Sequence, residues 1–365
     1  MPIVTAGGSD QGFALKQLGN GAPAFVRIKR WSPELEEALS RFSALDVAID
    51  SAFDGDPTSL WGLARFGARV EELHIPGTPK LDLGFISELT GLRKLSSAQM
   101  ADGPSFKKLG HLEKCYLHKP IKTLGRLWEA PALAELHLWS VSLRTMETLA
   151  PFAALRRLTL RQVDSLTSLD GIQALTVELL DFIYCRRLKS VAALRGMPSL
   201  EVFRLTGSGS IGDLAAAGDW PNLKTFAVSS GPPFVDFSIL EGSPRLEAFS
   251  INSTDMVGTP CSIAPFTRMP RLKHVVLRAG PKKGFKCLRD VDRLAEISLL
   301  EYLMLDRGPD LPNVQFLRAL TNLTTLRLIR TNILDGDLSP VLDLPRLEKI
   351  QIYPHCKHYS HAFPS

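Results

Sequence analysis

The sequence lacks the features that define several large classes of protein. No apolar run approaches the roughly 20 residues needed to cross a bilayer. The first ten residues contain no basic stretch followed by an apolar one, so no signal peptide is predicted and a cytoplasmic location is expected. Aromatic residues make up only 8% of the chain. Opposing charges of 43 and 38 leave +5, which neither requires nor forbids an anionic partner.

The cysteines of the sequence do not predict disulfide or metal pairing. The chain has five cysteines, an odd number, and no two have the spacing of a thiol redox motif or a zinc knuckle. They stand far apart, at Cys115, Cys185, Cys261, Cys287 and Cys356. We therefore expect reduced thiols in a cytoplasmic protein, and no cofactor.

The length and the hydrophobic content set the next limits. At 365 residues the chain exceeds the usual size of one compact core, which predicts either two domains or an elongated array. A hydrophobic content of 45% excludes a disordered chain.

A six-residue pattern, apolar-x-x-apolar-x-apolar, occurs thirteen times from residue 70 onward at steps of 20 to 28 residues. The last two apolar positions of each copy alternate with other residues, which is the period of a half-buried strand. Each copy therefore predicts one strand and a short return. The first positions are Val70, Leu92, Leu112, Leu133, Leu155, Val177, Leu200, Leu223, Leu246, Leu272, Leu300, Leu323 and Leu347.

This pattern resembles the strand of a leucine-rich repeat, and the step is similar to that of the short-repeat class found in stand-alone bacterial proteins. The resemblance covers about residues 44–353. It implies an α/β repeat solenoid, a horseshoe with a parallel β-sheet on the concave face and 3-10 or short helical returns on the convex face. The family usually places Asn or Cys eight residues after the first position. Only Cys185 matches here, so irregular turns are expected.

The two ends are expected to cover the array. Residues 12–31 predict a β-hairpin with its turn at 19–21. Ser32 and Pro33 then begin a helix. We assign residues 1–43 to an N-terminal cap, 44–353 to the solenoid and 354–365 to a C-terminal tail.

Two motifs suggest chemistry at first sight. Gly207, Gly209 and Gly212 match a dinucleotide-binding glycine pattern, but the next strand begins too soon for the required helix, so a glycine-rich turn explains them better. The tail has three histidines beside Cys356, at spacings that match no structural zinc pattern. Whether His355, His358 and His361 bind a metal stays open, and no metal is assigned.

No local nucleophile motif occurs either, although a triad assembled by the fold is not excluded by sequence. An enzyme is not predicted.

The exposed face of the predicted sheet is the more informative surface. Positions three, five, seven and eight of each copy should face outward. Trp139 and Tyr184 are expected to flank Arg161, because Trp, Tyr and Arg are the residue types that carry binding hot spots. The competing interpretation is an ordinary solvated sheet with Trp139 packed on its own turn. The predicted partner-binding residues are Tyr116, His118, His137, Trp139, Arg161, Asp181 and Tyr184.

Later copies give two lower-ranked surfaces. The first has mixed charges that suit salt bridges between strands as well as a partner: Arg278, Asp306, Arg307, Arg327 and Arg330. The second is the basic segment 268–293, which has nine Lys and Arg against two Asp and a net charge of +7. It is either a solvated convex surface or a site for an acidic protein or a phosphate backbone. Its most clustered cations are Lys282, Lys283, Lys286 and Arg289.

The leading hypothesis is therefore a monomeric, non-catalytic solenoid that binds a protein partner through its concave face. The resemblance to bacterial leucine-rich proteins further implies a stoichiometric inhibitor or an immunity-type partner of a toxin. The alternative is nucleic-acid binding through segment 268–293, which lacks the interleaved aromatic residues that such sites use.

Overall fold

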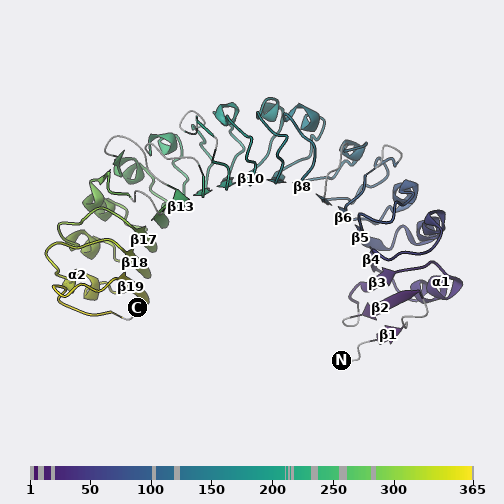
Figure 1. Cartoon of the computed structure of the whole chain (residues 1–365), viewed down its shortest axis with the longest axis horizontal. Coiled ribbons are helices and arrows are strands. Elements are labelled where there is room, and N and C mark those ends of the chain that lie inside the picture. The colour runs from purple at the N-terminus through teal and green to yellow at the C-terminus, as the bar shows by residue number, and fades with distance from the viewer. Residues whose placement is uncertain are drawn as a thin grey trace. The chain divides into compact units, whose positions relative to one another are not determined.

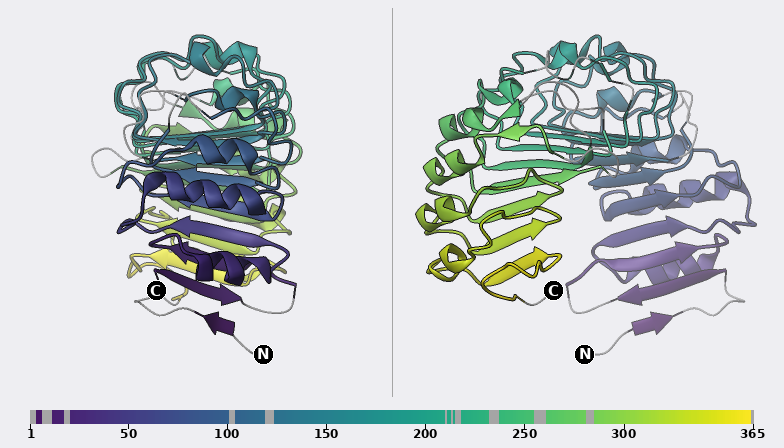
Figure 2. Two further views of the ribbon diagram at one scale, coloured as in Figure 1. Left: turned by 90° about the vertical axis from the view of Figure 1, so that its right-hand side faces the viewer. Right: turned by 60° about the vertical axis from the view of Figure 1, so that its left-hand side comes forward.

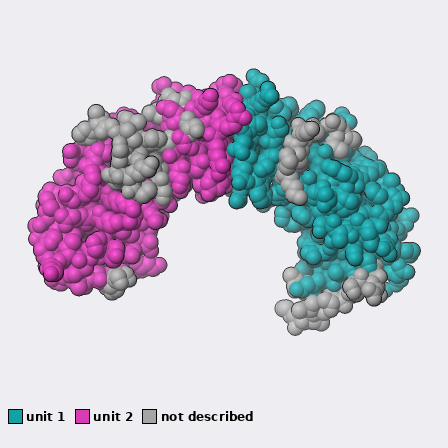
Figure 3. All heavy atoms as spheres, viewed as in Figure 1, with its two compact units in different colours: residues 1–165, 174–176 teal, residues 166–173, 177–365 magenta. Residues whose placement is uncertain are grey.

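The computed structural model describes residues 4–6, 12–17, 21–100, 104–118, 124–209, 211–212, 214, 218–231, 237–254, 261–280 and 285–363 (Figure 1). The chain divides into two compact units (Figure 3). Unit 1 comprises residues 1–165 and 174–176, and unit 2 comprises residues 166–173 and 177–365.

Unit 1 is a parallel sheet preceded by an antiparallel hairpin. Strands β1 to β3 pair in antiparallel fashion, and from β3 to β9 each strand pairs in parallel with the next. The strands are β1 Val4–Ala6, β2 Phe13–Gln17, β3 Ala24–Ile28, β4 Leu45–Ile49, β5 Val70–Ile75, β6 Lys94–Ser97, β7 Lys114–Leu117, β8 Glu135–Trp139 and β9 Arg157–Arg161.

The predicted hairpin and helix are present at the start of unit 1. Strands β2 and β3 form the hairpin, and turn residues 19–20 lie outside the described residues. Helix α1, Pro33–Ser40, begins where the Ser32 hydroxyl accepts the Leu35 N–H at 3.2 Å. Its apolar face buries Leu35 and Leu39. Whether residues 1–43 act as a separate cap stays a prediction.

Unit 2 repeats the same arrangement. Its main sheet pairs in parallel from β10 to β19, and the short strands β14 and β16 form a separate parallel pair. The strands are β10 Leu179–Ile183, β11 Val202–Thr206, β12 Thr225–Ser229, β13 Ala248–Thr254, β14 Cys261–Ser262, β15 His274–Ala279, β16 Leu288–Arg289, β17 Tyr302–Asp306, β18 Thr325–Ile329 and β19 Lys349–Tyr353.

The returns between strands are short 3-10 turns on the side of the sheet opposite its exposed face. In unit 1 they are η1 Pro57–Phe66, η2 Gly84–Glu88, η3 Leu127–Glu129 and η4 Glu147–Leu149, while η5 Ile172–Ala174 lies where the units divide. In unit 2 they are η6 Ala192–Leu194, η8 Ser238–Leu240, η9 Ala264–Arg268, η10 Val291–Glu296, η11 Gln315–Ala319 and the one-turn helix α2 Ser339–Leu342.

The strand register places equivalent apolar positions opposite one another. In unit 1, Leu136 pairs with Leu158, and in unit 2, Phe203 pairs with Phe226. All of these side chains are fully buried. Within each unit, Figure 2 shows successive strands lying side by side. Every copy of the repeat pattern carries a strand, so the predicted solenoid and its parallel sheet are confirmed.

Aromatic side chains fill much of the core of unit 2. The rings of Phe203 and Phe226 stack with centroids 5.5 Å apart, and those of Phe226 and Phe249 with centroids 5.6 Å apart. Trp220 joins this stack, and its indole N–H donates to the Leu194 carbonyl at 2.8 Å. Because such large groups are buried between successive repeats, each repeat depends on its neighbours for its core.

The residue that follows the strand is left-handed in seven repeats, with φ between 47° and 65°. Six of these residues donate their N–H to the carbonyl at the end of the next strand, at 2.5–2.8 Å. The chain therefore leaves the sheet at an equivalent point in each of these repeats. The residues are Ser140, Gln162, Tyr184, Gly207, Ser230, Arg307 and Arg330.

In two turns of unit 2 a hydroxyl group stands eight residues after the first apolar position of the repeat. The buried Ser208 hydroxyl accepts the Cys185 N–H at 3.1 Å. The buried Thr331 hydroxyl accepts the Gly308 N–H at 3.1 Å and donates to the Ile329 carbonyl at 3.2 Å. These contacts satisfy backbone groups that the turn would otherwise leave buried and unpaired.

We predict that Gly207→Ala destabilises unit 2 by about 1–3 kcal/mol. Gly207 has φ +65°, and an added Cβ would lie 2.1 Å from Cδ1 of the Tyr184 ring. Urea unfolding measures the loss. Gly110→Ala is the matched control, since its Cβ would meet nothing within 4 Å. Equal stability of the two variants would contradict this account of the glycine.

Candidate functional site

In unit 1 the residues that alternate with the buried positions form rows across the exposed face of the sheet. Parallel register aligns His74 with Ser96, Ser96 with Tyr116, and Tyr116 with His137. A second row aligns Trp139 with Arg161. Five predicted residues, Tyr116, His118, His137, Trp139 and Arg161, therefore lie in this one unit. We call them, with Glu135 and Gln162, the unit 1 patch.

Tyr116, Glu135 and His137 form a fixed cluster within the patch. The Tyr116 and His137 rings stack with centroids 4.3 Å apart and 14° between their planes. One oxygen of Glu135 accepts the Tyr116 hydroxyl at 3.0 Å and lies 2.7 Å from Nε2 of His137. A single carboxylate thus holds both rings in place.

The environment shifts the pKa values of two members of this cluster. Burial, and then the hydrogen bond to Glu135, raises the pKa of Tyr116 to about 12. Burial also acts to raise the pKa of Glu135, but hydrogen bonds from His137 and Tyr116 outweigh it and hold that pKa below its usual value. The cluster therefore keeps an ionised acceptor and a neutral phenol at neutral pH.

The Trp139 side chain is fixed by contacts with its neighbours, but much of its ring is exposed to solvent. Its indole N–H donates to Oε1 of Gln162 at 2.6 Å, and the Arg161 guanidinium lies 4.9 Å from the ring centroid. The His118 ring approaches it edge-on with centroids 6.0 Å apart. The side chain is still 41% exposed. Trp139 therefore contacts both the preceding and the following repeat.

A hydroxyl connects two histidines on this face. The Ser96 hydroxyl lies 2.8 Å from Nε2 of His118 and 3.2 Å from Nδ1 of His74. Burial lowers the pKa of His118, and the positive charges of His74 and His137 lower it further. His118 is consequently favoured in its neutral form at neutral pH.

The residue types of Glu135 and Ser96 did not mark them as candidates in the sequence. Both stand at outward-facing positions of their repeats, so the positional rule could have found them. Their importance comes from contacts with the neighbouring strand, which the identity of one residue does not reveal.

Asp181 and Tyr184 belong to unit 2. Asp181 pairs in register with Arg204 on β11. Tyr184 is left-handed, 39% exposed and packed on the backbone of Gly207. That contact accounts for the first glycine of the G-x-G-x-x-G sequence. The expectation that Trp139 and Tyr184 flank Arg161 stays a prediction.

The second predicted surface lies entirely in unit 2 and has a buried carboxylate at its centre. Asp306 is 1% exposed, and Arg330 contacts it through two hydrogen bonds of 3.0 Å each. Arg278 contacts the same carboxylate at 3.3 Å. Arg307 donates to the Gly280 carbonyl at 2.7 Å, and Arg327 stands on β18 opposite Met304.

The basic segment 268–293 is largely neutralised where the structure describes it. Lys282 and Lys283 lie outside the described residues. Lys286 pairs with Asp310 at 3.1 Å, and Arg289 is exposed. Four other cations of the segment also reach carboxylates beyond it: Arg268 with Glu241, Lys273 with Glu301, Arg278 with Asp306, and Arg293 with Glu296.

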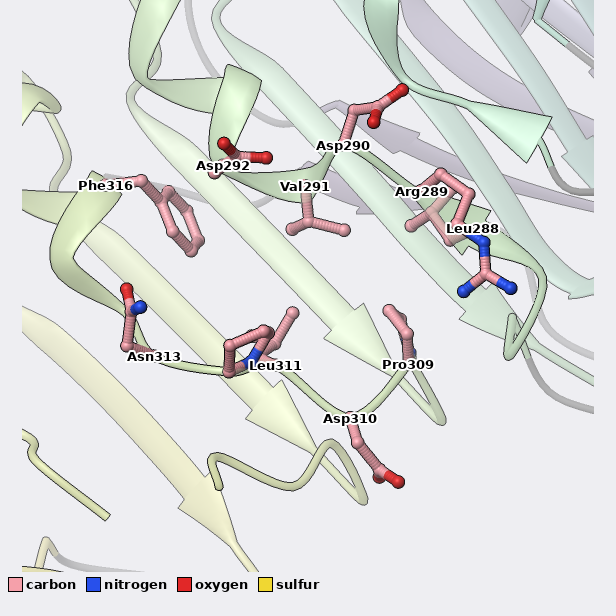
Figure 4. Close-up of a pocket in the computed structure, with 11 residues that line it drawn as sticks. Leu288, Arg289, Asp290, Val291, Asp292, Pro309, Asp310, Leu311, Asn313 and Phe316 are labelled. Atoms are coloured by element: carbon pink, nitrogen blue, oxygen red, sulfur yellow. The ribbon is translucent and has the colours of Figure 1, made fainter. Parts of the chain in front are cut away.

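A cleft of about 400 Å³ lies beside this segment (Figure 4). Leu288, Val291, Leu311 and Phe316 contribute apolar surface to it. Its charged lining is mixed, since Arg289 stands with three aspartates, and Figure 4 shows Asp290 and Asp310 pointing away from one another. Asp290 also accepts the Ser262 hydroxyl at 2.6 Å. The cleft therefore does not form a uniform phosphate-binding surface.

The C-terminal tail packs against the last repeats. Nε2 of His358 lies 2.8 Å from the Ile333 carbonyl, and the Tyr359 hydroxyl accepts the Ile333 N–H at 3.2 Å. His355 meets the Tyr359 ring edge-on. Within the described part of the chain, no three His, Cys, Asp or Glu side chains are grouped as metal ligands would be. His358 therefore has a packing role in the tail.

All five cysteines are free, and three of them are buried. Burial raises the pKa of the Cys115 thiol far above its usual value, which makes it a poor nucleophile. The helices that the structure describes are all too short or too polar to cross a membrane.

No protein-family model and no curated protein matches the sequence. Among solved structures, the internalin InlF of Listeria monocytogenes matches 88% of this chain and 83% of its own, at 16% identity and a TM-score of 0.57. A leucine-rich repeat protein of Leptospira interrogans matches 88% of this chain and 93% of its own, at 14% identity and a TM-score of 0.50. A chain of the Toll–Spatzle complex of Drosophila matches 96% of this chain. The match covers 51% of the Drosophila chain, at 13% identity and a TM-score of 0.55.

We predict that the free energy of unfolding decreases as the pH falls below about 6.5. The pKa of His118 is lower in the folded than in the unfolded chain, so the unfolded chain binds more protons in this range. This contribution is complete above the unfolded pKa and is lost as the pH falls through the folded one. Urea titrations of the wild type and His118→Gln at several pH values test it. The variant should show the smaller pH dependence, and parallel curves would contradict the assignment.

Proposed function

Because this chain is a leucine-rich repeat solenoid, we propose that it is a non-catalytic scaffold that binds a protein partner through the exposed face of its parallel sheet. The proposed interface in unit 1 is the unit 1 patch. Asp181 and Tyr184 are the corresponding proposal for unit 2. The proposed setting is the cytoplasm, where five free thiols remain reduced.

The state of Trp139 is the observation that carries this proposal. Exposed aromatic residues beside an arginine are characteristic of binding hot spots, and here the ring is fixed from two sides before any partner arrives. The neighbouring Tyr116 and His137 rings are fixed by Glu135. Little side-chain entropy remains to be lost on binding, so more of the contact energy contributes to affinity.

Solved complexes that share the fold support the same general role. Toll is seen in complex with Spatzle, and mouse RP105 is seen in complex with MD-1. The finer role that we propose, a stoichiometric inhibitor or immunity-type protein, needs only a preformed surface and no catalytic group.

Nucleic-acid binding through segment 268–293 is disfavoured by the ion pairs of its cations. Lys286 pairs with Asp310, and Arg268 pairs with Glu241. A cation that already has a carboxylate partner gains less by neutralising a phosphate.

We predict that Trp139→Ala weakens partner capture from lysate of the native host by about thirtyfold, or ~2 kcal/mol. The substitution removes the exposed ring and the surface on which Arg161 is held. Quantitative mass spectrometry of the captured proteins measures the loss.

Trp61→Ala is the matched control for this experiment. Trp61 is 43% exposed, and its indole N–H donates to Asp82 at 2.9 Å, but it lies on η1, on the opposite side of the sheet. Capture by this variant should equal that of the wild type. A partner that both variants retain equally well would remove the unit 1 patch from the interface.

A further inference from the structure

The later strands of unit 2 carry an imbalance of charge on their exposed face. Strands β13, β15, β17, β18 and β19 are all described, and within them Asp306 is the one carboxylate. Arg278, Arg327 and Lys349 are cations of the same strands. Arg307 and Arg330 directly follow two of them. We call Arg278, Arg307, Arg327 and Arg330 the arginine cluster.

The position of Asp306 determines the arrangement of two of these arginines. Asp306 pairs in register with Arg278 on β15. It also pairs with Ile329 on β18, which immediately precedes Arg330. Its carboxylate consequently lies between the two guanidinium groups: it accepts two hydrogen bonds of 3.0 Å from Arg330 and forms an ion pair with Arg278 at 3.3 Å.

These contacts leave much of each arginine side chain exposed to solvent. The side chain of Arg278 is 48% exposed and that of Arg330 is 43% exposed, whereas Asp306 is covered. A guanidinium has five N–H donors, and Asp306 accepts from only two of those of Arg330. The carboxylate neutralises one charge and fixes the orientation of two arginines.

Neighbouring residues enlarge this surface and do not neutralise its positive charge. Arg307 is tied to the Gly280 carbonyl at 2.7 Å, a contact that leaves its positive charge in place. Arg327 is half-buried between Met304 and Gln351 in register. Tyr353, at the end of β19, is 53% exposed. Fixed arginines beside an exposed tyrosine match the composition of protein-binding hot spots.

We propose that the arginine cluster binds a carboxylate-rich segment of a protein partner, with Arg278 and Arg330 as the principal donors and Asp306 as a positioning residue. The planar guanidinium fork matches a carboxylate through two parallel hydrogen bonds. Donors that are already oriented lose less entropy on binding than mobile ones. The inference rests on the proposed function in that the exposed sheet face is the binding face, but it uses none of the unit 1 residues.

The extent of the cluster favours an acidic protein segment over a nucleic acid. A phosphate backbone is bound through many cations along a continuous track. In unit 2 several cations beyond the sheet face, Arg268 and Lys286 among them, already have carboxylate partners. The arginine cluster itself spans only a few neighbouring strands, which suits a short segment.

A fluorescein-labelled decaglutamate peptide tests the proposal with the full chain at neutral pH and ~50 mM salt, read by fluorescence anisotropy. We expect saturable binding that Arg330→Gln weakens by about tenfold to a hundredfold. Arg318→Gln is the matched control, because Arg318 is 46% exposed and donates to Asp343 at 2.8 Å away from the strands. Its affinity should stay within about twofold of the wild type.

The Asp306→Asn variant distinguishes binding by oriented arginine donors from binding by positive charge alone. The variant is almost the same shape and has one more net positive charge, so attraction by charge alone predicts tighter binding. If Asp306 positions the two arginines, binding becomes weaker despite the added charge. Circular dichroism confirms that the variant is folded, and Arg330→Gln gives an independent readout if it is not.

Four results would overturn the proposal: no binding of the peptide, equal losses in Arg330→Gln and Arg318→Gln, tighter binding by folded Asp306→Asn, or stronger binding of a single-stranded oligothymidine of equal length. Trp139→Ala should bind the peptide as the wild type does. A failure at the arginine cluster is therefore distinguishable from a failure of the unit 1 patch.

Discussion

No repeat of this chain can bury its apolar positions by itself, and the rest of the structure follows from that constraint. Each repeat contributes one short strand and one turn, which leaves two open faces that only the repeats on either side can cover. The parallel register then has to align equivalent positions, as it aligns Leu136 with Leu158 and Phe203 with Phe226. Once the buried positions are aligned, the alternate positions are aligned too. Rows of exposed side chains are thus a consequence of core packing, and both proposed binding surfaces consist of such rows.

The same alignment explains why charges distant in the sequence neutralise one another. Residues 20 to 28 positions apart become neighbours on adjacent strands, so Arg278 meets Asp306 and Lys273 meets Glu301. The surface charge of this protein is therefore decided across the strands and not along the chain. Where a cation stands opposite another cation or a neutral residue, as around Arg327, positive charge remains. Where it stands opposite a carboxylate, the charge is cancelled.

The sequence was sufficient to predict the fold because the repeat pattern indicates which positions are buried and at what spacing they recur along the chain. It also placed Trp139, Tyr116 and His137 on the exposed face, because alternation along a strand is a local property. The sequence could not predict that one oxygen of Glu135 holds two rings, since that contact depends on side-chain rotamers across two strands. The net charge of segment 268–293 did not reveal its ion pairs, because most of the partner carboxylates belong to the neighbouring repeat. The division into two units has no counterpart in the repeat pattern.

The left-handed residue after the strand has a consequence for how this surface can change. Its backbone role, an N–H donated to the next strand's carbonyl, is the same whether the side chain is that of Ser140, Tyr184 or Arg307. That backbone role does not depend on the side chain, although several side chains at these positions make contacts of their own, as Gln162 does with Trp139 and Arg330 with Asp306. These turn positions form a natural set of variable sites at the edge of a constant framework. A library diversified at Ser140 or Ser230 would vary the side chain while keeping the backbone hydrogen bond that fixes the turn.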